Sequence, residues 1–254
     1  MGKIAQTTPE HIWGLNMVCI GISHPFFPSF SNCNESLPSN LLSSLASPGI
    51  VGCAAHIPSV QGYLYPGEEA FVARAGRKRY MEFRAGRICA RYALAKLGIP
   101  SRAILVRDDR TPIWPSGTIG SISHTNEYCV AMATSTARFS GLGIDIETST
   151  PMDLELSPII CSPSELRWLQ SLAPGDQGTW LKALFVAKEA IYKCQFCVTE
   201  RVLDFLDISI EFSPDGRSFR ADSYSARVSD IALAIVGELF LMDTVIAAKA
   251  VLAN

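Results

Sequence analysis

The chain has 254 residues, of which 48% are apolar and 18% are charged, so it can bury a large core as one big domain or two small ones. Its formal net charge of −2 argues against a nucleic-acid-binding protein, which usually carries a strong basic excess. Basic side chains cluster in one segment only: Arg74, Arg77, Lys78, Arg79, Arg84, Arg87 and Arg91. A cluster confined to one predicted helix suits a small polyanion better than a duplex.

Punctuation and periodicity predict the elements in chain order. Segment 28–48 is rich in Ser, Asn and Pro and predicts a long loop without packed structure, and residues 1–65 hold no motif that we can place. The pattern from 70 to 97 is helical, and Gly98-Ile99-Pro100 predicts its end. Further strands are predicted at 103–107, 118–124, 128–134, 141–147, 205–212, 217–222, 228–236 and 239–249, and further helices at 163–172 and 178–194.

The run 231–251 is apolar enough to raise the question of a transmembrane segment. It contains Glu238, Asp243 and Lys249, and charges inside a membrane are costly, so two strands joined near Gly237-Glu238 fit better. The eight cysteines are scattered, and we find no secretory signal, which favours reduced thiols. We therefore expect a cytoplasmic protein that does not enter a membrane.

Each half of the chain contains a helix followed by several strands, which predicts an α+β fold. No repeat is visible at the level of residues. The shared order of elements nevertheless permits two similar lobes, with a boundary near Phe139-Ser140.

Two segments suggest chemistry. In Gly143-Ile144-Asp145-Ile146-Glu147, a β-strand would place Asp145 and Glu147 on one face. Two adjacent carboxylates repel unless a cation lies between them, and oxygen ligands suit Mg²⁺. In a helix over 179–194, Glu189 and Lys193 would share a face. Taken alone, the first pair is more often a solvated strand edge and the second is more often surface decoration.

The order of the motifs changes this balance. Ser121-Ile122-Ser123-His124, then G-I-D-I-E at 143–147, then F-x-A-K-E-A-x-Y-K at 185–193 together resemble the 4′-phosphopantetheinyl transferase superfamily, specifically its larger surfactin- and enterobactin-type branch. The Arg-rich segment 79–94 and the segments 112–117 and 120–125 follow the order of the same family. The resemblance covers roughly residues 70–212.

This resemblance implies the fold and the reaction. Two similar lobes would be related by pseudo-twofold symmetry, each with a mainly antiparallel sheet packed on a long helix. Residues 1–139 would form the N-terminal lobe that grips the coenzyme A nucleotide, and 140–254 the lobe with the magnesium and catalytic residues. The reaction would move the 4′-phosphopantetheine group of coenzyme A to a serine of an apo acyl- or peptidyl-carrier protein, releasing adenosine 3′,5′-bisphosphate. We expect a monomer that serves siderophore or polyketide synthesis.

Chemistry and resemblance together assign roles. Asp145 and Glu147 would hold Mg²⁺, and Glu189 would either complete the metal sphere or accept the serine proton, directly or through a bound water. Lys193 and Lys188 would stabilise phosphate charge. The resemblance places Ser123 and His124 at coenzyme A, with His124 on its 3′-phosphate. It also directs Arg79 and Arg87 toward the nucleotide end.

Some alternatives stay open. Around 107–111 the family often shows a Gly and a Lys, so either Arg107 or Arg110 could take that basic role. A non-catalytic carrier-binding module would have little reason to keep Asp145, Glu147, Glu189 and Lys193 together. Another magnesium phosphotransferase would be expected to show a Gly-rich phosphate loop, which this sequence lacks.

Overall fold

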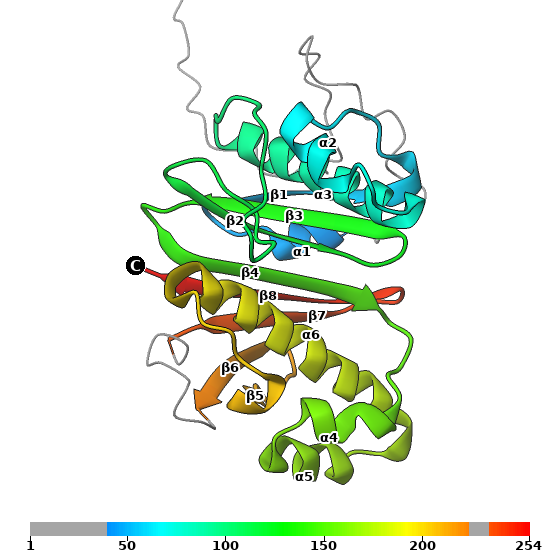
Figure 1. The fold of residues 1–254 in the computed structure, drawn as a ribbon. Coiled ribbons are helices and arrows are strands. Elements are labelled where there is room, and N and C mark those ends of the chain that lie inside the picture. Colours follow the sequence, from blue (N-terminus) through cyan, green and yellow to red (C-terminus); the bar gives the residue numbers. More distant parts are fainter. Residues whose placement is uncertain (1–39, 224–233) are drawn as a thin grey trace, which may run out of the picture.

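The computed structural model describes residues 40–223 and 234–254 and has an α+β fold (Figure 1). Two antiparallel sheets are each covered by one long helix. The helices are α1 Leu41–Leu45, α2 Pro66–Val72, α3 Arg77–Lys96, α4 Ser157–Ile160, α5 Pro163–Ser171 and α6 Pro174–Thr199, with 3₁₀ turns η1 Ile57–Ser59, η2 Leu154–Leu156 and η3 Phe205–Asp207. The strands are β1 Ile50–His56, β2 Thr118–His124, β3 Tyr128–Ser135, β4 Phe139–Thr148, β5 Ile208–Phe212, β6 Ser218–Ser223, β7 Val236–Leu241 and β8 Val245–Ala253.

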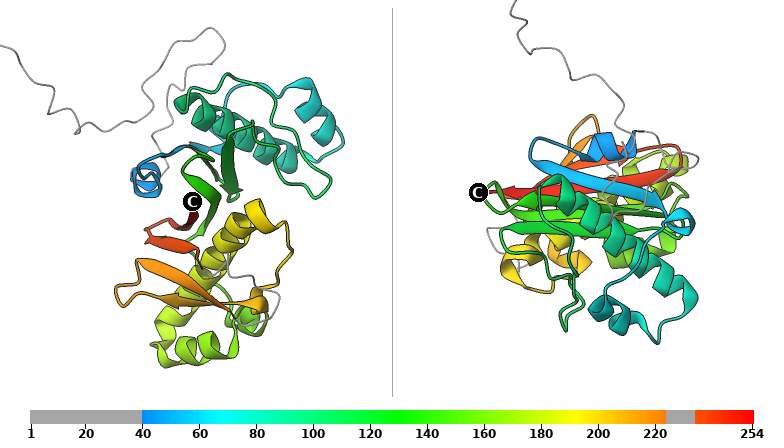
Figure 2. Two further views of the ribbon diagram at one scale, coloured as in Figure 1. Left: turned by 90° about the vertical axis from the view of Figure 1, so that its left-hand side faces the viewer. Right: turned by 90° about the horizontal axis from the view of Figure 1, so that it is seen from above.

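The first sheet has the strand order β1-β3-β2, and α3 lies along one of its faces (Figure 2). Small side chains line the contact, because Cys89, Ala93 and Cys129 are all fully buried there. Such side chains let the helix approach the sheet closely. The strands predicted at 118–124 and 128–134 are confirmed as β2 and β3.

The second sheet has the order β4-β8-β7-β6-β5, and α6 packs across β4 and β8. Leu184 and Ile191 of α6 are fully buried in the core between helix and sheet. The strand predicted at 141–147 lies within β4, and the helices predicted at 163–172 and 178–194 correspond to α5 and α6.

The two sheets meet where edge strand β2 runs beside edge strand β4. Serine hydroxyls of β2 join the two strands: Ser121 Oγ accepts from Ile144 N at 3.0 Å, and Ser123 Oγ accepts from Ile146 N at 3.3 Å. We call this contact the β2–β4 seam. Because Asp145 lies between the two joined residues, the seam fixes the strand that carries the predicted metal ligands.

The single helix predicted over 70–97 is wrong, since α2 ends at Val72 and α3 begins at Arg77. Gly76 is the N-cap of α3 with an extended backbone, which separates the two helices. The predicted stop is confirmed: Gly98 has φ +76°, a conformation that glycine adopts without strain.

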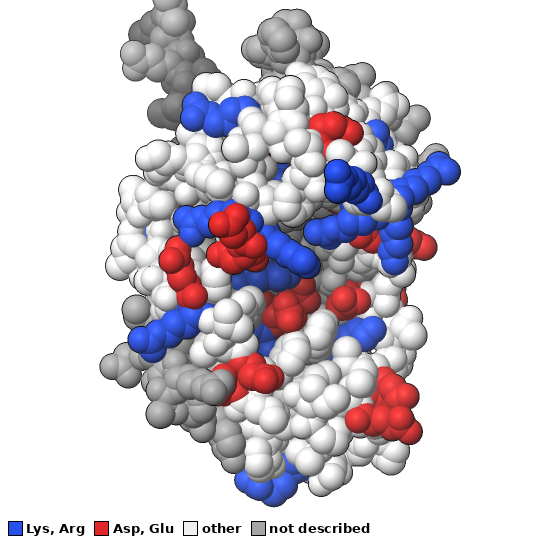
Figure 3. Space-filling view, in the orientation of Figure 1, with Lys and Arg blue, Asp and Glu red and all other residues white. Residues whose placement is uncertain are grey.

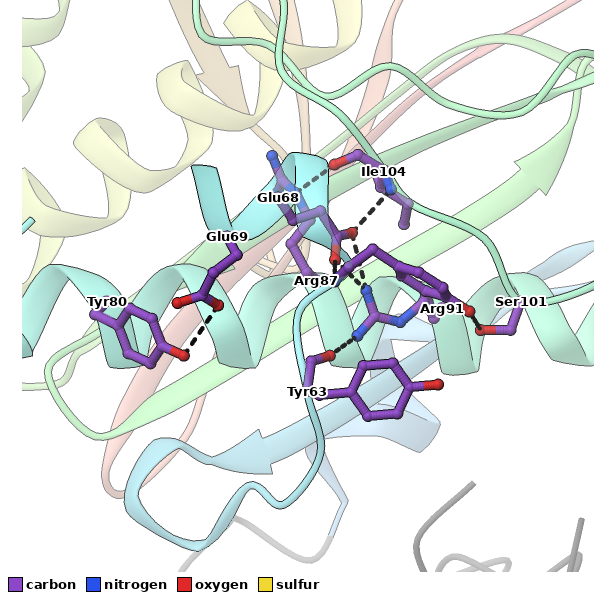
Figure 4. Close-up of polar contacts among 9 residues, drawn as sticks. Tyr63, Glu68, Glu69, Tyr80, Arg87, Arg91, Ser101 and Ile104 are labelled. Atoms are coloured by element: carbon purple, nitrogen blue, oxygen red, sulfur yellow. Dashed lines mark hydrogen bonds and ion pairs between the residues drawn. The ribbon is translucent and has the colours of Figure 1, made fainter. Parts of the chain in front are cut away.

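The strand predicted at 103–107 is also wrong, because only an isolated bridge joins Val106 to Pro112. Side chains replace the missing neighbouring strand. Ile104 N donates to Glu68 Oε1 at 2.8 Å, and Arg87 Nε donates to Ile104 O at 2.8 Å (Figure 4). The apolar pattern arises because Ile104 is fully buried against α3.

Two other predictions need correction. Within the loop predicted at 28–48, residues 28–39 lie outside the described residues, but 41–45 form α1, whose two terminal leucines are buried. Gly237 lies inside β7 and not at a turn, which instead falls between β7 and β8. A Cβ on Gly237 would lie 2.1 Å from the ring of Phe219, so glycine is needed there for packing. Most of the strand predicted at 228–236 lies outside the described residues.

Glu68 and Glu165 occupy matching places in the two halves. Each is the third residue of a short helix that begins with proline, and each accepts the backbone N–H of its own helix N-cap, at 2.8 and 2.6 Å. Each also pairs with a basic residue of the long helix. Glu68 binds Arg91 at 2.7 Å, and Glu165 binds Lys188 at 2.7 Å.

The matching positions are 97 residues apart (68 and 165, 91 and 188). An aromatic pair follows the same spacing: Phe71 lies 5.4 Å from Phe83, and Trp168 lies 5.5 Å from Trp180, measured between ring centroids. These contacts arise from residues that differ in identity but agree in position, size and charge.

The spacing also exposes a short sequence repeat. Residues 90–96 and 187–193 share the pattern Ala, basic, any, Ala, aliphatic, any, Lys. Arg91 and Lys188 each donate a further hydrogen bond to a matching carbonyl, of Tyr63 at 2.6 Å and of Ile160 at 2.7 Å. The statement that no residue-level repeat is visible was therefore wrong, because the match appears only when basic and aliphatic residues are grouped by type.

Candidate active site

Charged side chains of both signs gather across the middle of one face, between the two halves of the molecule (Figure 3). This face includes the β2–β4 seam and the part of α6 that packs on β4. The site is described below from the strand outward.

Asp145 lies at the centre of the β2–β4 seam and is 6% exposed. Its Oδ1 accepts a hydrogen bond from Ser123 Oγ at 2.7 Å and from Lys193 Nζ at 2.7 Å. Its Oδ2 is buried without a hydrogen-bond partner, and Arg84 Nε is the one other such side-chain atom among the described residues. A buried carboxylate oxygen without a partner is costly, so this atom requires an explanation.

Glu147 and Glu189 are partly buried near Asp145, one on β4 and the other on α6. Burial raises the pKa of both carboxyls above the ordinary value, and repulsion from Asp145 raises each further. Glu147 also raises the pKa of Glu189, while Lys193 lowers it. The electrostatic coupling shows that the three carboxylates lie in one environment, which agrees with the sequence prediction that they belong together.

Gly143 explains how α6 reaches the strand. A Cβ at this position would lie 1.9 Å from Ala190 O and 2.6 Å from Cys194 N, both backbone atoms of α6. Only glycine permits this approach, because backbone atoms of a packed helix cannot move aside cheaply. The glycine of the G-I-D-I-E motif thus lets Glu189 and Lys193 lie over Asp145.

The residues present fit a divalent cation in one specific respect. Asp145 Oδ2 is a buried, unpartnered anionic oxygen, and two further carboxylates lie nearby with raised pKa values. Oxygen donors of this kind are those that Mg²⁺ prefers. Within residues 40–223 and 234–254, however, no three His, Cys, Asp or Glu side chains are grouped closely enough to form a ready-made metal site.

Ser123 and Lys193 both face Asp145. Lys193 Nζ donates to Asp145 Oδ1, to Ile144 O at 3.1 Å, and weakly to Ser123 Oγ at 3.5 Å. Ser123, predicted at coenzyme A, therefore fixes Asp145 through its hydroxyl, and Lys193, predicted as a charge stabiliser, neutralises the same carboxylate.

Lys188 does not join this group. It is 3% exposed, and its Nζ donates at 2.7 Å to Glu165 Oε2, Ile160 O and Phe205 O. Burial lowers its pKa, and Glu165 opposes that effect. Three short contacts use all three ammonium hydrogens, so the geometry is that of a core ion pair and gives no support to the predicted phosphate contact.

The residues predicted at the nucleotide end are spread over two elements. Arg79 is exposed on α3, whereas Arg87 is 5% exposed, with its guanidinium 4.3 Å from the Phe83 ring centroid. Burial lowers the pKa of Arg87 to about 10. His124 ends β2, with Nδ1 3.3 Å from Thr125 O.

The structure separates the two candidates in the segment 107–111. Arg107 pairs with Glu200 at 2.6 Å across the two halves, with both side chains exposed. Arg110 has φ +71°, a backbone conformation that favours glycine.

Lys182 is a site residue that the sequence reasoning missed. It lies on α6, seven residues before Glu189, and its charge lowers the pKa of Glu147. Spacing at two helical turns could have revealed it, because residues i and i+7 share a face.

Comparison with known proteins identifies the family. A model of the 4′-phosphopantetheinyl transferase N-terminal domain matches residues 67–134, and a model of the 4′-phosphopantetheinyl transferase superfamily matches residues 141–238. The chain is 37% identical to 4′-phosphopantetheinyl transferase Npt of Nocardia iowensis over 160 residues, which are 63% of this chain and 70% of that protein. The chain therefore belongs to the 4′-phosphopantetheinyl transferase superfamily, and the family predicted from the motifs is confirmed.

Other relatives agree. Svp of Streptomyces mobaraensis, also a 4′-phosphopantetheinyl transferase, is 37% identical over 62% of this chain and 65% of that protein. Enterobactin synthase component D of Escherichia coli O157:H7 is 34% identical over 59% of this chain and 70% of that protein. The chain thus matches about two thirds of the length of these curated relatives.

Similarity to solved structures is low. A holo-(acyl-carrier-protein) synthase from Bacillus anthracis str. Ames gives a TM-score of 0.36 and 19% identity over 46% of this chain and 98% of that chain. Among the described residues, no helix has the length and apolar character needed to cross a membrane.

Proposed function

We propose that this protein has the activity for which its family is named. It transfers the 4′-phosphopantetheine group of coenzyme A to a serine hydroxyl of an apo acyl- or peptidyl-carrier protein. A bond forms between the serine oxygen and the pantetheine-side phosphorus, and the bond from that phosphorus to the bridging oxygen breaks. Adenosine 3′,5′-bisphosphate leaves with the bridging oxygen. The observation that carries the proposal is the convergence of Asp145, Glu147, Glu189 and Lys193 at the β2–β4 seam.

Glu189 is the group that accepts the serine proton. Burial raises its pKa, which makes the carboxylate a better base than an exposed glutamate. Its place on α6, one helical turn from Lys193, keeps it beside Asp145. Lys193 holds Asp145 in position and limits the repulsion among the three carboxylates.

Asp145, Glu147 and Glu189 would hold Mg²⁺, with Asp145 Oδ2 as the oxygen that the protein leaves unpartnered. When bound there, the ion supplies charge neutralisation for the phosphate oxygens. Ser123 keeps Asp145 Oδ1 engaged, which leaves Oδ2 as the free ligand atom.

The nucleotide end of coenzyme A lies against the N-terminal half. Arg79 is exposed and binds phosphate there, and His124 binds the 3′-phosphate at the end of β2. Arg87 supports this surface from below, through its contacts with Phe83 and Ile104.

The two halves form similar lobes related by a pseudo-twofold axis, with the boundary near 139–140, where β4 begins. The matched contacts of Glu68 with Arg91 and of Glu165 with Lys188 support this arrangement. The protein acts as a cytoplasmic monomer on carriers of siderophore or polyketide synthesis, without nucleic acid or membrane. The name of one relative, enterobactin synthase component D, supports the siderophore class.

Intact-mass analysis tests the proposal. Apo carrier domains from siderophore, polyketide and fatty-acid synthesis are incubated with coenzyme A, Mg²⁺ and this protein. At least one carrier should gain the mass of phosphopantetheine, and omission of coenzyme A should abolish the gain. If no carrier changes mass while a known transferase modifies the same carriers, the proposal fails.

A further inference from the structure

Lys182 is a buried lysine on the face of α6 that carries Glu189 and Lys193. It precedes them by seven and eleven residues, which are close to whole numbers of helical turns, so the three side chains form one stripe. The residue is 9% exposed, and its charge acts on Glu147 of the facing strand. Lys182 therefore lies at the Glu147 end of the carboxylate group, whereas Lys193 lies at the Asp145 end.

The ammonium of Lys182 is available. In the part of the chain that the structure describes, it has no hydrogen bond or ion pair, whereas Lys188, Lys193 and Lys249 each pair with a carboxylate. Nor is its Nζ among the fully buried atoms without a partner, so the head group reaches the surface of the site. A stem held in the protein and an open ammonium are what an anion-binding lysine needs.

The 97-residue spacing provides an internal comparison. Position 85 of the first half matches 182 and is Ala85, which is fully buried. Position 92, which matches Glu189, is Tyr92. The structural contacts are kept in both halves, but these two positions differ. A core that packs with alanine gains nothing from a lysine, since burying an ammonium is costly. The lysine at 182 is thus a feature of the half that holds the carboxylates.

The balance of charge indicates what Lys182 binds. Three carboxylates face one paired ammonium, that of Lys193, and the pyrophosphate of coenzyme A adds further negative charge. We propose that Lys182 is a substrate-binding residue whose ammonium contacts a pyrophosphate oxygen of coenzyme A at the Glu147 end of the site. This inference rests on the proposed function and adds to it a cation that the motifs did not identify.

Calorimetry with coenzyme A at saturating Mg²⁺ tests this role in the full-length protein. Lys182→Met should weaken coenzyme A binding and raise its KM about tenfold or more, as expected for the loss of a charge-assisted contact. Lys182→Arg should restore part of the affinity. Arg167→Met is the matched control, because it removes one positive charge from an exposed position on α5 and should change neither value.

Mn²⁺ titration of the same variants separates substrate binding from an effect on Glu147. Unchanged coenzyme A affinity in a folded Lys182→Met, or a loss confined to metal affinity, would overturn the inference. An equal loss in Arg167→Met would do the same, because it would indicate bulk charge. If Lys182→Met does not fold, Lys182→Gln keeps a polar head group and is read in the same way. A wild-type protein that binds coenzyme A but modifies no carrier would refute the proposed function, while the calorimetry would still decide the role of Lys182.

Discussion

Lys193 Nζ lies 2.7 Å from Asp145 Oδ1 and 3.1 Å from Ile144 O, so one ammonium binds both a carboxylate and the strand that carries it. Its match in the first half, Lys96, donates to Gly52 O at 2.7 Å, and the residue after that glycine is Cys53. The lysine-to-strand contact is therefore common to both halves. Only the second half adds a carboxylate to it, which gives a structural contact a place in the site.

The first prediction uses this pair of lysines. Lys193→Met should reduce turnover at least tenfold and lower stability by about 1–3 kcal/mol, because it leaves a buried carboxylate unpaired. Lys96→Met removes the matching ammonium where no carboxylate has been added, so it should lower stability while turnover stays close to wild type. Thermal unfolding and carrier mass gain measure the two effects. Equal turnover losses in both variants would contradict a role specific to Lys193.

The second prediction concerns the metal. Chelation should abolish transfer, and Mg²⁺ or Mn²⁺ should restore it, because Asp145 Oδ2 has no partner within the protein. Asp145→Asn should lose both transfer and Mn²⁺ binding measured by calorimetry. Asp176→Asn, an exposed change on the same helix as Glu189, should keep both. Normal transfer by Asp145→Asn in chelated buffer would rule out this metal site.

The third prediction concerns pH and Glu189. Burial raises its pKa in the folded protein, so the ionised base is lost as pH falls, at a higher pH than for an ordinary glutamate. The same shift means that ionised Glu189 lowers stability, fully above its folded pKa and progressively less as pH falls through it. Glu189→Gln should therefore raise the melting temperature at neutral pH in metal-free buffer, and this gain should vanish in acid.

Turnover of Glu189→Gln decides between base and ligand. At saturating Mg²⁺ a lost base leaves turnover low, whereas a lost ligand is rescued. The exposed Glu155→Gln serves as control and should change neither stability nor rate appreciably. Recovery of the wild-type rate at high Mg²⁺ would exclude proton abstraction by Glu189.

The fourth prediction tests the close approach of α6. Gly143→Ala should lower stability by about 1–3 kcal/mol and reduce turnover, because the new Cβ would overlap the backbone of α6. Gly175→Ala lies on the same helix with no atom within 4 Å of its Cβ, so it should be neutral or slightly stabilising. Wild-type turnover by Gly143→Ala would show that the helix tolerates displacement.

The second half of the fold was easier to predict than the first. Alternating residues in 141–147 gave the strand, and the long pattern of 178–194 gave the helix, because each element packs as its own periodicity indicates. At Ile104 the same reasoning failed, since Glu68 and Arg87 satisfy its backbone through side chains. Such contacts cross the fold and leave no local pattern.

The site could be predicted in part. Asp145, Glu147, Glu189 and Lys193 come together as the spacing suggested, because period-2 and four-residue spacings fix directions within one element. Lys188 was misjudged because it is adjacent to Glu189 in sequence, whereas neighbours on a helix point about 100° apart. Lys182 was missed because no motif includes it.

The last prediction tests whether Lys188 is structural. Lys188→Met should lower stability by about 3–5 kcal/mol, because it leaves Glu165 buried and unpaired. The double variant Glu165→Leu with Lys188→Met should lose much less than the sum of the two single changes, since it removes both charges together. Thermal unfolding of the four proteins gives the coupling, and the matched pair Glu68 and Arg91 should give a similar one. Coenzyme A affinity should stay unchanged in every variant that folds. A specific loss of that affinity in the double variant would return Lys188 to the phosphate-binding group.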